Sequence, residues 1–281
     1  MNVSLGYYLA QPYVLRALLV AVLVAFCAAL LGVSLVLKRY SLIGDGLSHV
    51  AFGSMAVAAV TSVAELYISL PVTVLSAVAL LRGSTKSKLK GDAAIAVVSV
   101  SSLAIAYLLF SKFSTGNVSS DVCKTLFGAS SIMTLSDTDV LLSVILTLVV
   151  FVFYLFFYHK IFAVTFDPAF SEATGVKTKL YDTLLAVITG IVIVLAMKLV
   201  GALLITALIV FPALSAMRLF RSFRKVTVCA AVISVICAVT GILISLLVPG
   251  LPVGSCIVVA NLLIFGIFYL ISVLCKGGLA R

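Results

Sequence analysis

Long apolar runs alternate with short charged or turn-rich breaks along the whole chain. Most runs have about 20 residues, the length at which an α-helix crosses roughly 30 Å of hydrocarbon. A segment in lipid must satisfy its own backbone hydrogen bonds, so this pattern predicts membrane-spanning helices. We expect nine spans, at about 14–37, 43–63, 66–82, 91–111, 138–158, 180–199, 201–217, 226–248 and 253–274.

One very short break decides the number of spans. Only the stretch from Lys198 to Gly201 separates the run at 180–199 from the run at 201–217, and eight spans result if the two form one broken helix. The longest polar connections, 112–137 and 159–179, leave no room for a soluble domain. We therefore expect a single transmembrane permease-like domain over residues 1–281.

Composition supports an all-α polytopic membrane protein. Of the 281 residues, 64% are hydrophobic and 10% are charged, whereas a soluble domain has about 25% charged residues. This deficit excludes a soluble enzyme, a disordered protein and a nucleic-acid binder. The net charge of +10 does not point to nucleic acid, because the basic residues flank apolar spans and do not gather on one polar face.

The basic residues also predict the orientation in the cell membrane. Positive charge is enriched in cytoplasmic connections. With nine spans, alternate connections place Arg16, Lys112, Lys124 and Lys198 outside, which predicts an external N-terminus and a cytoplasmic C-terminus. The cytoplasmic side then carries Lys38, Arg39, Arg82, Lys86, Lys88, Lys90, Lys160, Lys177, Lys179, Arg218, Arg221, Arg224, Lys225, Lys276 and Arg281.

No catalytic motif is present in the sequence. It lacks the phosphate-cradling G-x-x-x-x-G-K-[ST] loop, the HExxH and GxSxG motifs, and paired zinc-ligand cysteines. We therefore expect a chain without enzymatic activity and without a cofactor of its own. If ATP drives transport, the ATP is bound and hydrolysed on a separate chain.

Asp45 and His49 form the main candidate site. They are four residues apart at the start of the second span, so on a helix they share one face. Ionisable residues inside a bilayer are costly and mark functional sites. A carboxylate and an imidazole suit a metal such as Zn²⁺ or Mn²⁺. Two ligands are too few, but a two-fold dimer with the pair facing its axis supplies four. The alternative is that Asp45 caps the helix and His49 either packs beside it or bonds to Asp45.

The connection at 159–179 contains a second candidate. Asp167 is a good N-cap, Pro168 fits the first helical position and Gly175 fits the position after the C-cap. These signals predict a two-turn helix at about 168–174, with Phe170 and Ala173 available to dock. It is either a simple connector or a coupling helix pressed into an ATPase.

Several segments carry a family resemblance. Residues 41–53 are similar to a G-D-x-L-x-H entry to a second span, and residues 167–176 to a D-P-x-x-A/S-x-A-x-G-V loop. Residues 196–213 are the most specific match and look most like zinc-uptake permeases; 126–128 and Pro252-x-Gly254 also match. Together they resemble the permease subunits of the zinc/manganese/iron ABC importer family.

The resemblance implies an architecture and a set of partners. The fold would be that of the vitamin B12 permease, the type II ABC importer, as a two-fold dimer with a second copy or a paralogue. Cytoplasmic ATP-binding subunits and an extracytoplasmic metal-binding protein would be partners. The transported metal would be Zn²⁺ first, then Mn²⁺ or iron. Asp45 and His49 would contact it, and Glu172, Ala173 and Gly175 would belong to the ATPase-contacting loop with Asp167 and Pro168.

Two points stay open in the sequence. Pro212 removes one backbone hydrogen bond within its span, which predicts either a static kink or a gating hinge. Residues 211–215 read Phe-Pro-Ala-Leu-Ser where many family members have Ile-Pro-Ala-Ala-Thr. The alternative function is a gradient-driven secondary metal transporter or channel, which needs charged relays in several spans. Beyond the Asp45–His49 pair, only Asp92 and Asp182 are candidates, and both lie near span starts.

Overall fold

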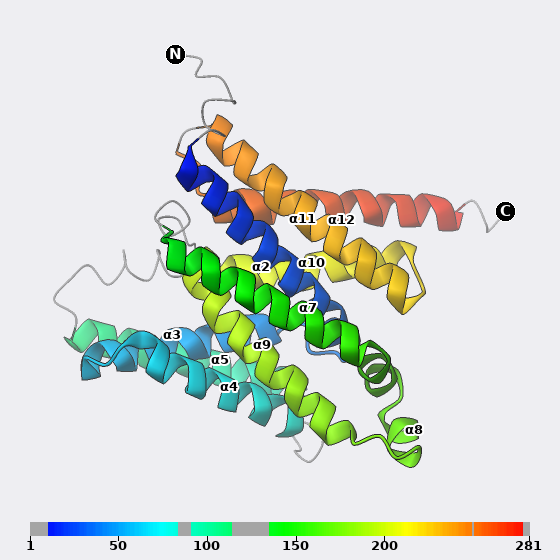
Figure 1. The fold of residues 1–281 in the computed structure, drawn as a ribbon, viewed down its shortest axis with the longest axis horizontal. Helices are drawn as coiled ribbons and strands as arrows, with labels where there is room; N and C mark the ends of the chain where they lie inside the picture. The colour runs from blue at the N-terminus through cyan, green and yellow to red at the C-terminus, as the bar shows by residue number, and fades with distance from the viewer. Residues whose placement is uncertain (1–10, 84–90, 114–134, 249, 278–281) are drawn as a thin grey trace.

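The computed structural model describes residues 11–83, 91–113, 135–248 and 250–277. These ranges fold into a bundle of helices, shown in Figure 1. Nine of the helices in the described ranges are long and apolar enough to cross a membrane. They are α2 (Pro12–Leu37), α3 (Ile43–Thr61), α4 (Glu65–Gly83), α5 (Gly91–Phe113), α7 (Asp137–Phe166), α9 (Thr178–Val200), α10 (Ala202–Leu219), α11 (Phe223–Leu247) and α12 (Val253–Gly277), with the short α8 (Pro168–Ala173) between α7 and α9.

Each predicted span coincides with one long helix, and one boundary differs clearly. Helix α7 continues to Phe166, so the first part of the predicted 159–179 connection is helical. The polar residues His159 and Lys160 lie exposed on the surface of this helix and do not end it. Beyond them, Ile161 is buried and the ring of Phe162 packs 5.4 Å from that of Phe223. Burial of this apolar face extends the helix.

The short break at Gly201 separates two helices that run in opposite senses. In Figure 1, α9 runs from α8 at the lower right towards the upper left, and α10 returns towards the right. Gly201 makes this reversal with φ 95° and ψ 156°, a backbone region that favours glycine. The described residues therefore contain two separate helices here and not one broken helix.

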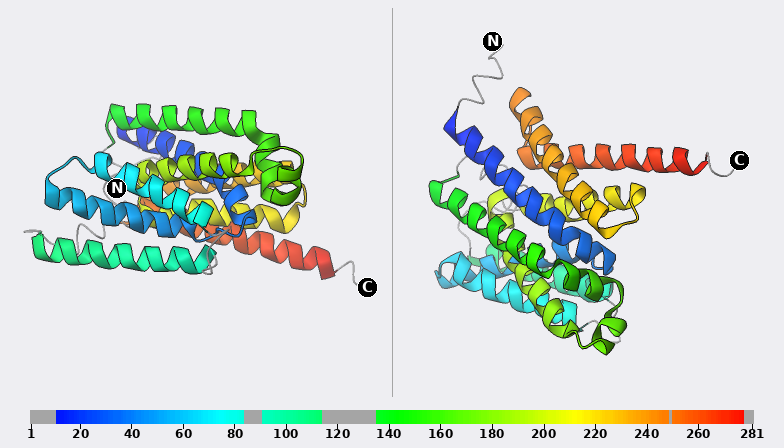
Figure 2. Two further views of the ribbon diagram at one scale, coloured as in Figure 1. Left: turned by 90° about the horizontal axis from the view of Figure 1, so that it is seen from below. Right: turned by 45° about the vertical axis from the view of Figure 1, so that its right-hand side comes forward.

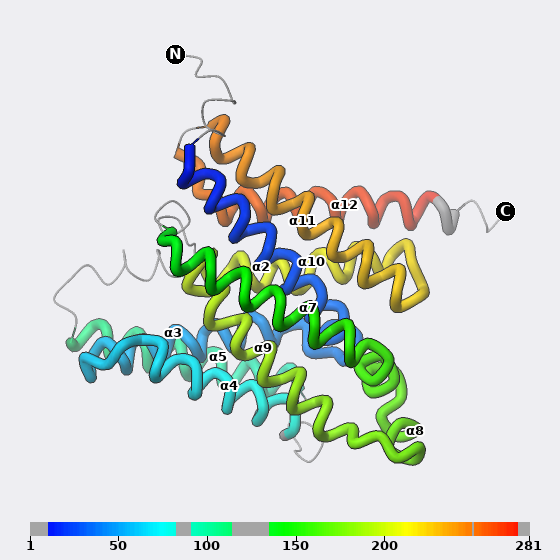
Figure 3. Tube along the Cα trace, viewed as in Figure 1, coloured from blue at the N-terminus to red at the C-terminus, as the bar shows by residue number. Residues whose placement is uncertain are grey.

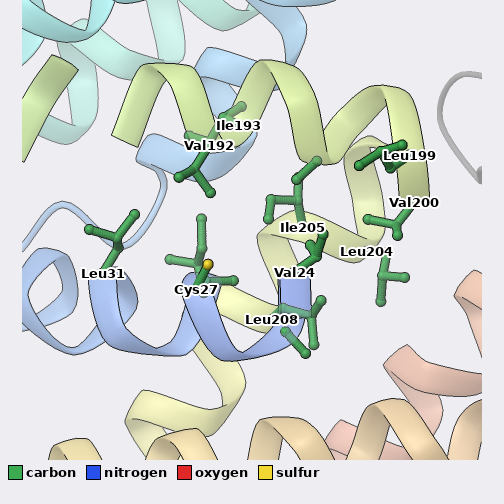
Figure 4. Close-up of a cluster of buried hydrophobic side chains, with 14 of the residues drawn as sticks. Val24, Cys27, Leu31, Val192, Ile193, Leu199, Val200, Leu204, Ile205 and Leu208 are labelled. Carbon is green, nitrogen blue, oxygen red and sulfur yellow. The ribbon is translucent and has the colours of Figure 1, made fainter. Parts of the chain in front are cut away.

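Helix α2 lies at the centre of the bundle and packs against α7, α9, α10 and α11 (Figures 1 and 2). Figure 4 shows its side chains Val24, Cys27 and Leu31 meeting those of α9 and α10. A helix that is apolar on all sides must be surrounded by protein or lipid. The backbone trace in Figure 3 shows the same central position of α2. The outer helices α5, α7 and α12 instead carry many exposed large apolar side chains, as expected of a surface in contact with lipid or with another subunit.

Glycines allow neighbouring helices to approach closely, as two contacts show. A Cβ added to Gly32 of α2 would lie 2.2 Å from the carbonyl oxygen of Ile209 in α10. A Cβ added to Gly46 of α3 would lie 2.5 Å from Cγ2 of Ile95 in α5. Small residues at such contacts are the common means of packing helices in a bilayer, where no hydrophobic effect drives the helices together.

The described ranges do not cover every sequence expectation. The segment 126–128 and several of the basic residues lie outside them. These basic residues are Lys86, Lys88, Lys90, Lys124 and Arg281.

Gly32→Ala is expected to destabilise the bundle. The added methyl group would overlap a backbone oxygen, which cannot rotate away, so α2 and α10 must separate. Overpacking of this kind costs about 1–3 kcal/mol. The check is thermal unfolding of the purified chain in detergent.

Gly266→Ala in α12 is the matched control, because nothing lies within 4 Å of the added Cβ. Alanine also favours the helix over glycine by up to about 1 kcal/mol. An equal loss of stability in both variants would contradict the proposed role of the α2–α10 contact.

Candidate functional site

A tight turn between α2 and α3 sets the position of the candidate metal pair. The amide of Tyr40 donates to the carbonyl of Leu35 at 2.9 Å, and the amide of Arg39 donates to that of Val36 at 3.0 Å. This is the Schellman pattern of helix ends, with Arg39 in the left-handed region at φ 64°. Helix α3 begins directly afterwards, at Ile43.

Asp45 and His49 lie side by side on the first turns of α3. His49 Nε2 is 3.5 Å from Asp45 Oδ1, which is longer than a good hydrogen bond. The side chain of Asp45 is 40% exposed and that of His49 is 15% exposed. The buried Nδ1 of His49 has no hydrogen-bond partner. Each of the two residues thus keeps bonding capacity that the described chain does not use.

Asp45 does not cap its helix. The N-cap of α3 is Leu42, whose side chain cannot accept a hydrogen bond, and Asp45 lies one turn inside. Its carboxylate still interacts favourably with the positive end of the helix dipole. The capping interpretation of Asp45 is therefore wrong, and the carboxylate is left available to a ligand.

The pair lies beside α10, far from the C-terminal end of that helix. The start of α3 packs against the first half of α10, since a Cβ added to Gly44 would lie 3.5 Å from Cα of Thr206 and 3.2 Å from Cδ1 of Ile209. Thr206 is about 20 Å along the helix axis from Leu219, the last residue of α10. The candidate ligands are therefore distant from the end of α10 that carries Arg218.

A groove of about 460 Å³ lies between the start of α3 and helices α10 and α12. Ser41 and Leu42, which directly precede α3, line it, whereas Asp45 and His49 do not. The other lining side chains are mainly apolar, with Thr206 and Ser255 among the exceptions. The groove therefore lies beside the turn that leads into α3 and does not include the candidate ligands.

The described part of one copy does not provide a complete metal site. No group of three or more His, Cys, Asp or Glu side chains in the described ranges is close enough to hold a metal ion. The described cysteines are free thiols, and Cys27 and Cys237 are fully buried in the core. A metal at Asp45 and His49 therefore needs further ligands from water or from another subunit.

The short helix α8 forms as its capping residues predict. Asp167 Oδ1 accepts a hydrogen bond from the amide of Phe170 at 2.9 Å, and Pro168 occupies the first turn. At the other end the amide of Val176 donates to the carbonyl of Ser171, and Gly175 has φ 84°. The exposed residues Phe170, Glu172 and Ala173 lie on this rigid turn.

An ion pair that the sequence interpretation did not anticipate joins the two candidate regions. The ammonium of Lys38, at the end of α2, donates to the carboxylate of Asp182, in the second turn of α9. The two side chains are 12% and 27% exposed. The sequence does contain a signal for this ion pair, because Lys38 and Asp182 carry opposite charges at the ends of two spans on the same side of the bundle. Through this pair the α2–α3 turn is tied to the segment that follows α8.

Two of the helices contain a proline in their interior. Pro212 is buried within α10, which runs without a break from Ala202 to Leu219. Pro71 occupies a similar interior position in α4 and was not singled out in the sequence. Whether Pro212 acts as a hinge stays a prediction.

Comparison with known proteins gives a consistent assignment. The model of the ABC 3 transport family matches residues 10–276. The manganese transport system membrane protein MntC of Halalkalibacterium halodurans is 28% identical over 91% of this chain and 86% of its own length. A probable iron transport system membrane protein of Haemophilus influenzae is 28% identical over 92% and 90%. The structure of PsaBC from Streptococcus pneumoniae in complex with Fab superimposes with a TM-score of 0.81, at 25% identity, over 94% of this chain and 93% of the other.

Breaking the Lys38–Asp182 pair is expected to lower stability. Removal of one partner leaves a largely buried charge without its counterion. In a double-mutant cycle with Lys38→Met and Asp182→Asn we expect a coupling energy of about 2 kcal/mol, below the values for fully buried pairs because Asp182 is partly solvated. The measurement is unfolding of each variant in detergent.

The exposed pair between Arg16 and Asp137 provides the control. Its atoms are 2.7 Å apart, but Asp137 is 82% exposed, so its coupling should fall within about 0–1 kcal/mol. Equal coupling energies in the two cycles would contradict a structural role for Lys38 and Asp182.

Proposed function

The chain belongs to the ABC 3 transport family, and on this premise we propose that it is the membrane-spanning subunit of an ATP-driven importer of a divalent transition metal. The observation that carries the proposal is the Asp45–His49 pair. It lies inside an otherwise apolar bundle, with an unpartnered His49 Nδ1 and an accessible carboxylate. Charged and polar groups at such positions mark transport pathways.

Two copies, or this chain and a paralogue, would form the pathway at a two-fold axis. Each copy offers one carboxylate and one imidazole on one face of α3, so two copies bring four ligands together. The Asp45 side chain is 40% exposed, which leaves its carboxylate accessible to a second subunit. Water completes the coordination of metals such as manganese, which accept mixed oxygen and nitrogen ligands.

Helix α8 would couple this pathway to the ATPase. Its Phe170 is 66% exposed, and its two capped ends make it a rigid element. Displacement of α8 moves the start of α9, and the Lys38–Asp182 pair joins α9 to the turn that precedes Asp45. This chain of contacts gives ATP hydrolysis on a separate subunit a mechanical connection to the metal ligands.

The orientation follows from the basic residues. With the nine described helices crossing in alternate directions, the helix ends and connections that carry Lys38, Arg39, Arg82, Lys177 and Arg221 would lie at the same end of the bundle as α8. We place this end in the cytoplasm by the positive-inside rule. The N-terminus of α2 then lies outside, where an extracytoplasmic metal-binding protein would deliver the metal.

We rank Mn²⁺ and Fe²⁺ ahead of Zn²⁺ as the transported metal. The relatives compared above are named for manganese and iron, whereas the sequence resemblance placed zinc first. A carboxylate–imidazole set without sulfur suits all three ions, and selectivity then rests on geometry and supply.

The test is uptake of Mn²⁺, Fe²⁺ and Zn²⁺ into vesicles that contain the chain with its ATPase, with and without ATP. Asp45→Asn and His49→Gln each remove one metal ligand while keeping side-chain size, so we expect ATP-dependent uptake to fall at least tenfold. Ser54→Ala on the same helix is the control, because the Ser54 hydroxyl bonds only to the Ala51 carbonyl among the described contacts and should leave uptake unchanged.

Two results would contradict the proposal. Wild-type uptake rates in the Asp45 and His49 variants would exclude them as metal ligands. Uptake that ignores ATP and follows an ion gradient would establish the alternative, a gradient-driven secondary transporter or channel.

Phe170→Ser is expected to weaken binding of the ATPase. Phe170 is 66% exposed on α8, so its loss removes an apolar contact for a partner and little of the chain's own packing. A buried aromatic anchor at an interface contributes about 2 kcal/mol or more. Copurification of the ATPase should therefore fall by more than tenfold.

Tyr67→Ser is the control for this measurement. Tyr67 is also exposed, but it lies at the start of α4, at the opposite end of the bundle. If the ATPase copurifies equally well with the wild-type chain and with both variants, α8 is not the coupling helix.

A further inference from the structure

A second groove, with a volume of about 680 Å³, lies between α11 and α12. The two helices diverge from their connecting turn, as Figures 1 and 2 show, so the space between them widens towards the start of α11. Its walls are the side chains of Val228, Val232 and Ile236 from α11 and of Ile264, Ile267 and Phe268 from α12. None of these six side chains carries a polar group.

The wide end of this groove is basic. Arg224 and Lys225 line it, and Arg221 lies just before α11. None of the three forms an ion pair with a carboxylate in the described ranges, and the first turn of α11 contains no acidic residue. Their positive charges therefore remain uncompensated by the described protein.

By contrast, the nearby basic residue Arg218 makes contacts within the protein. The guanidinium carbon of Arg218 lies 5.0 Å from the ring centroid of Tyr269, and the Ser272 hydroxyl donates to the Arg218 carbonyl at 3.3 Å. These contacts fasten α12 to the end of α10 and hold the groove in shape.

The dimensions of the groove match one leaflet of a bilayer. From Lys225 to Ile236 the α11 axis advances by about 17 Å, and half of the hydrocarbon core is about 15 Å thick. Basic side chains thus lie at the depth of the headgroups, and the apolar walls extend to the depth of the chain ends. Basic pockets between spanning helices are known to bind anionic headgroups.

A second copy of this chain fits this groove less well. The chain has a net charge of +10, and a symmetry-related copy would bring its own basic helix ends towards the same level of the membrane. No described carboxylate lies in the groove to balance Arg224 and Lys225. The charge favours an anionic occupant.

We propose that the groove between α11 and α12 is a binding site for an anionic phospholipid, with the phosphate at Arg224 and Lys225 and an acyl chain along Val228–Ile236 and Ile264–Phe268. The site is separate from the metal pathway, and the proposal does not depend on the transported substrate. The lipid would fill the space between two diverging helices and neutralise the basic end of α11.

The sequence offers a clean optical test because it contains no tryptophan. Phe268→Trp places a single reporter in the groove, and Ile236→Trp provides a second reporter at its deep end in case the first variant folds poorly. The full-length chain, reconstituted in phosphatidylcholine, is titrated with phosphatidylglycerol brominated on its acyl chains, and separately with equally brominated phosphatidylcholine. Quenching of the tryptophan emission measures occupancy of the groove.

We expect brominated phosphatidylglycerol to quench at much lower mole fraction than brominated phosphatidylcholine. A basic side chain near an anionic headgroup changes affinity about fivefold, so Arg224→Gln should weaken the preference about fivefold and the double change with Lys225→Gln about thirtyfold. Lys179→Gln removes an exposed charge at the start of α9, which does not line this groove, and should leave the preference unchanged. Inorganic phosphate should not displace the lipid, because it lacks the acyl contact.

Three results would overturn the proposal. Equal quenching by the two lipids would make the groove ordinary lipid-facing surface. No quenching by either lipid at both reporters would mean that protein, such as a second copy, covers the groove. Displacement by inorganic phosphate would reduce the site to a simple anion site.

Discussion

The backbone contact between α2 and α10 at Gly32 and Ile209 is the constraint on which the rest of the structure depends. Within a bilayer, helices gain nothing from excluding water, so close packing must hold them together. Ile209 contacts both α2 and α3. Its carbonyl oxygen would lie 2.2 Å from a Cβ added to Gly32, and its Cδ1 would lie 3.2 Å from a Cβ added to Gly44. One residue of α10 thus positions α2 and α3 together. The turn between α2 and α3, and with it Asp45, is held at a fixed depth.

The sequence predicted the fold closely because the signals for it are local. Apolar run length located the helices, and Asp167, Pro168 and Gly175 located α8 through capping chemistry that acts within a few residues. The polar residues His159 and Lys160 predict an end of the span at residue 158, whereas helix α7 continues to Phe166. A helix can continue past polar residues when its apolar face, here Ile161, has a buried surface to meet.

For the candidate site, too, the sequence predicted the local features but not the contacts between distant residues. The spacing of Asp45 and His49 predicted a shared helix face, and the structure places them 3.5 Å apart. Their position along α10 and the Lys38–Asp182 pair could not be predicted, because both depend on contacts between residues far apart in the sequence. The same holds for the divergence of α11 and α12, since nothing in either helix alone records the angle between them. Ligand number is a further case: in the proposed dimer it would depend on a second subunit, and one chain does not encode how two copies meet.

The incomplete ligand set has a consequence for transport. A zinc or manganese site with four strong ligands in one rigid chain would hold the ion tightly and release it slowly. In the proposed dimer, each copy holds only a carboxylate and an imidazole, so the affinity depends on the distance between the copies. A motion that α8 transmits to the α2–α3 turn through Lys38 and Asp182 would change that distance and weaken coordination. In this proposal, release of the metal would follow from the separation of two half-sites, and neither half-site would need to change its own geometry.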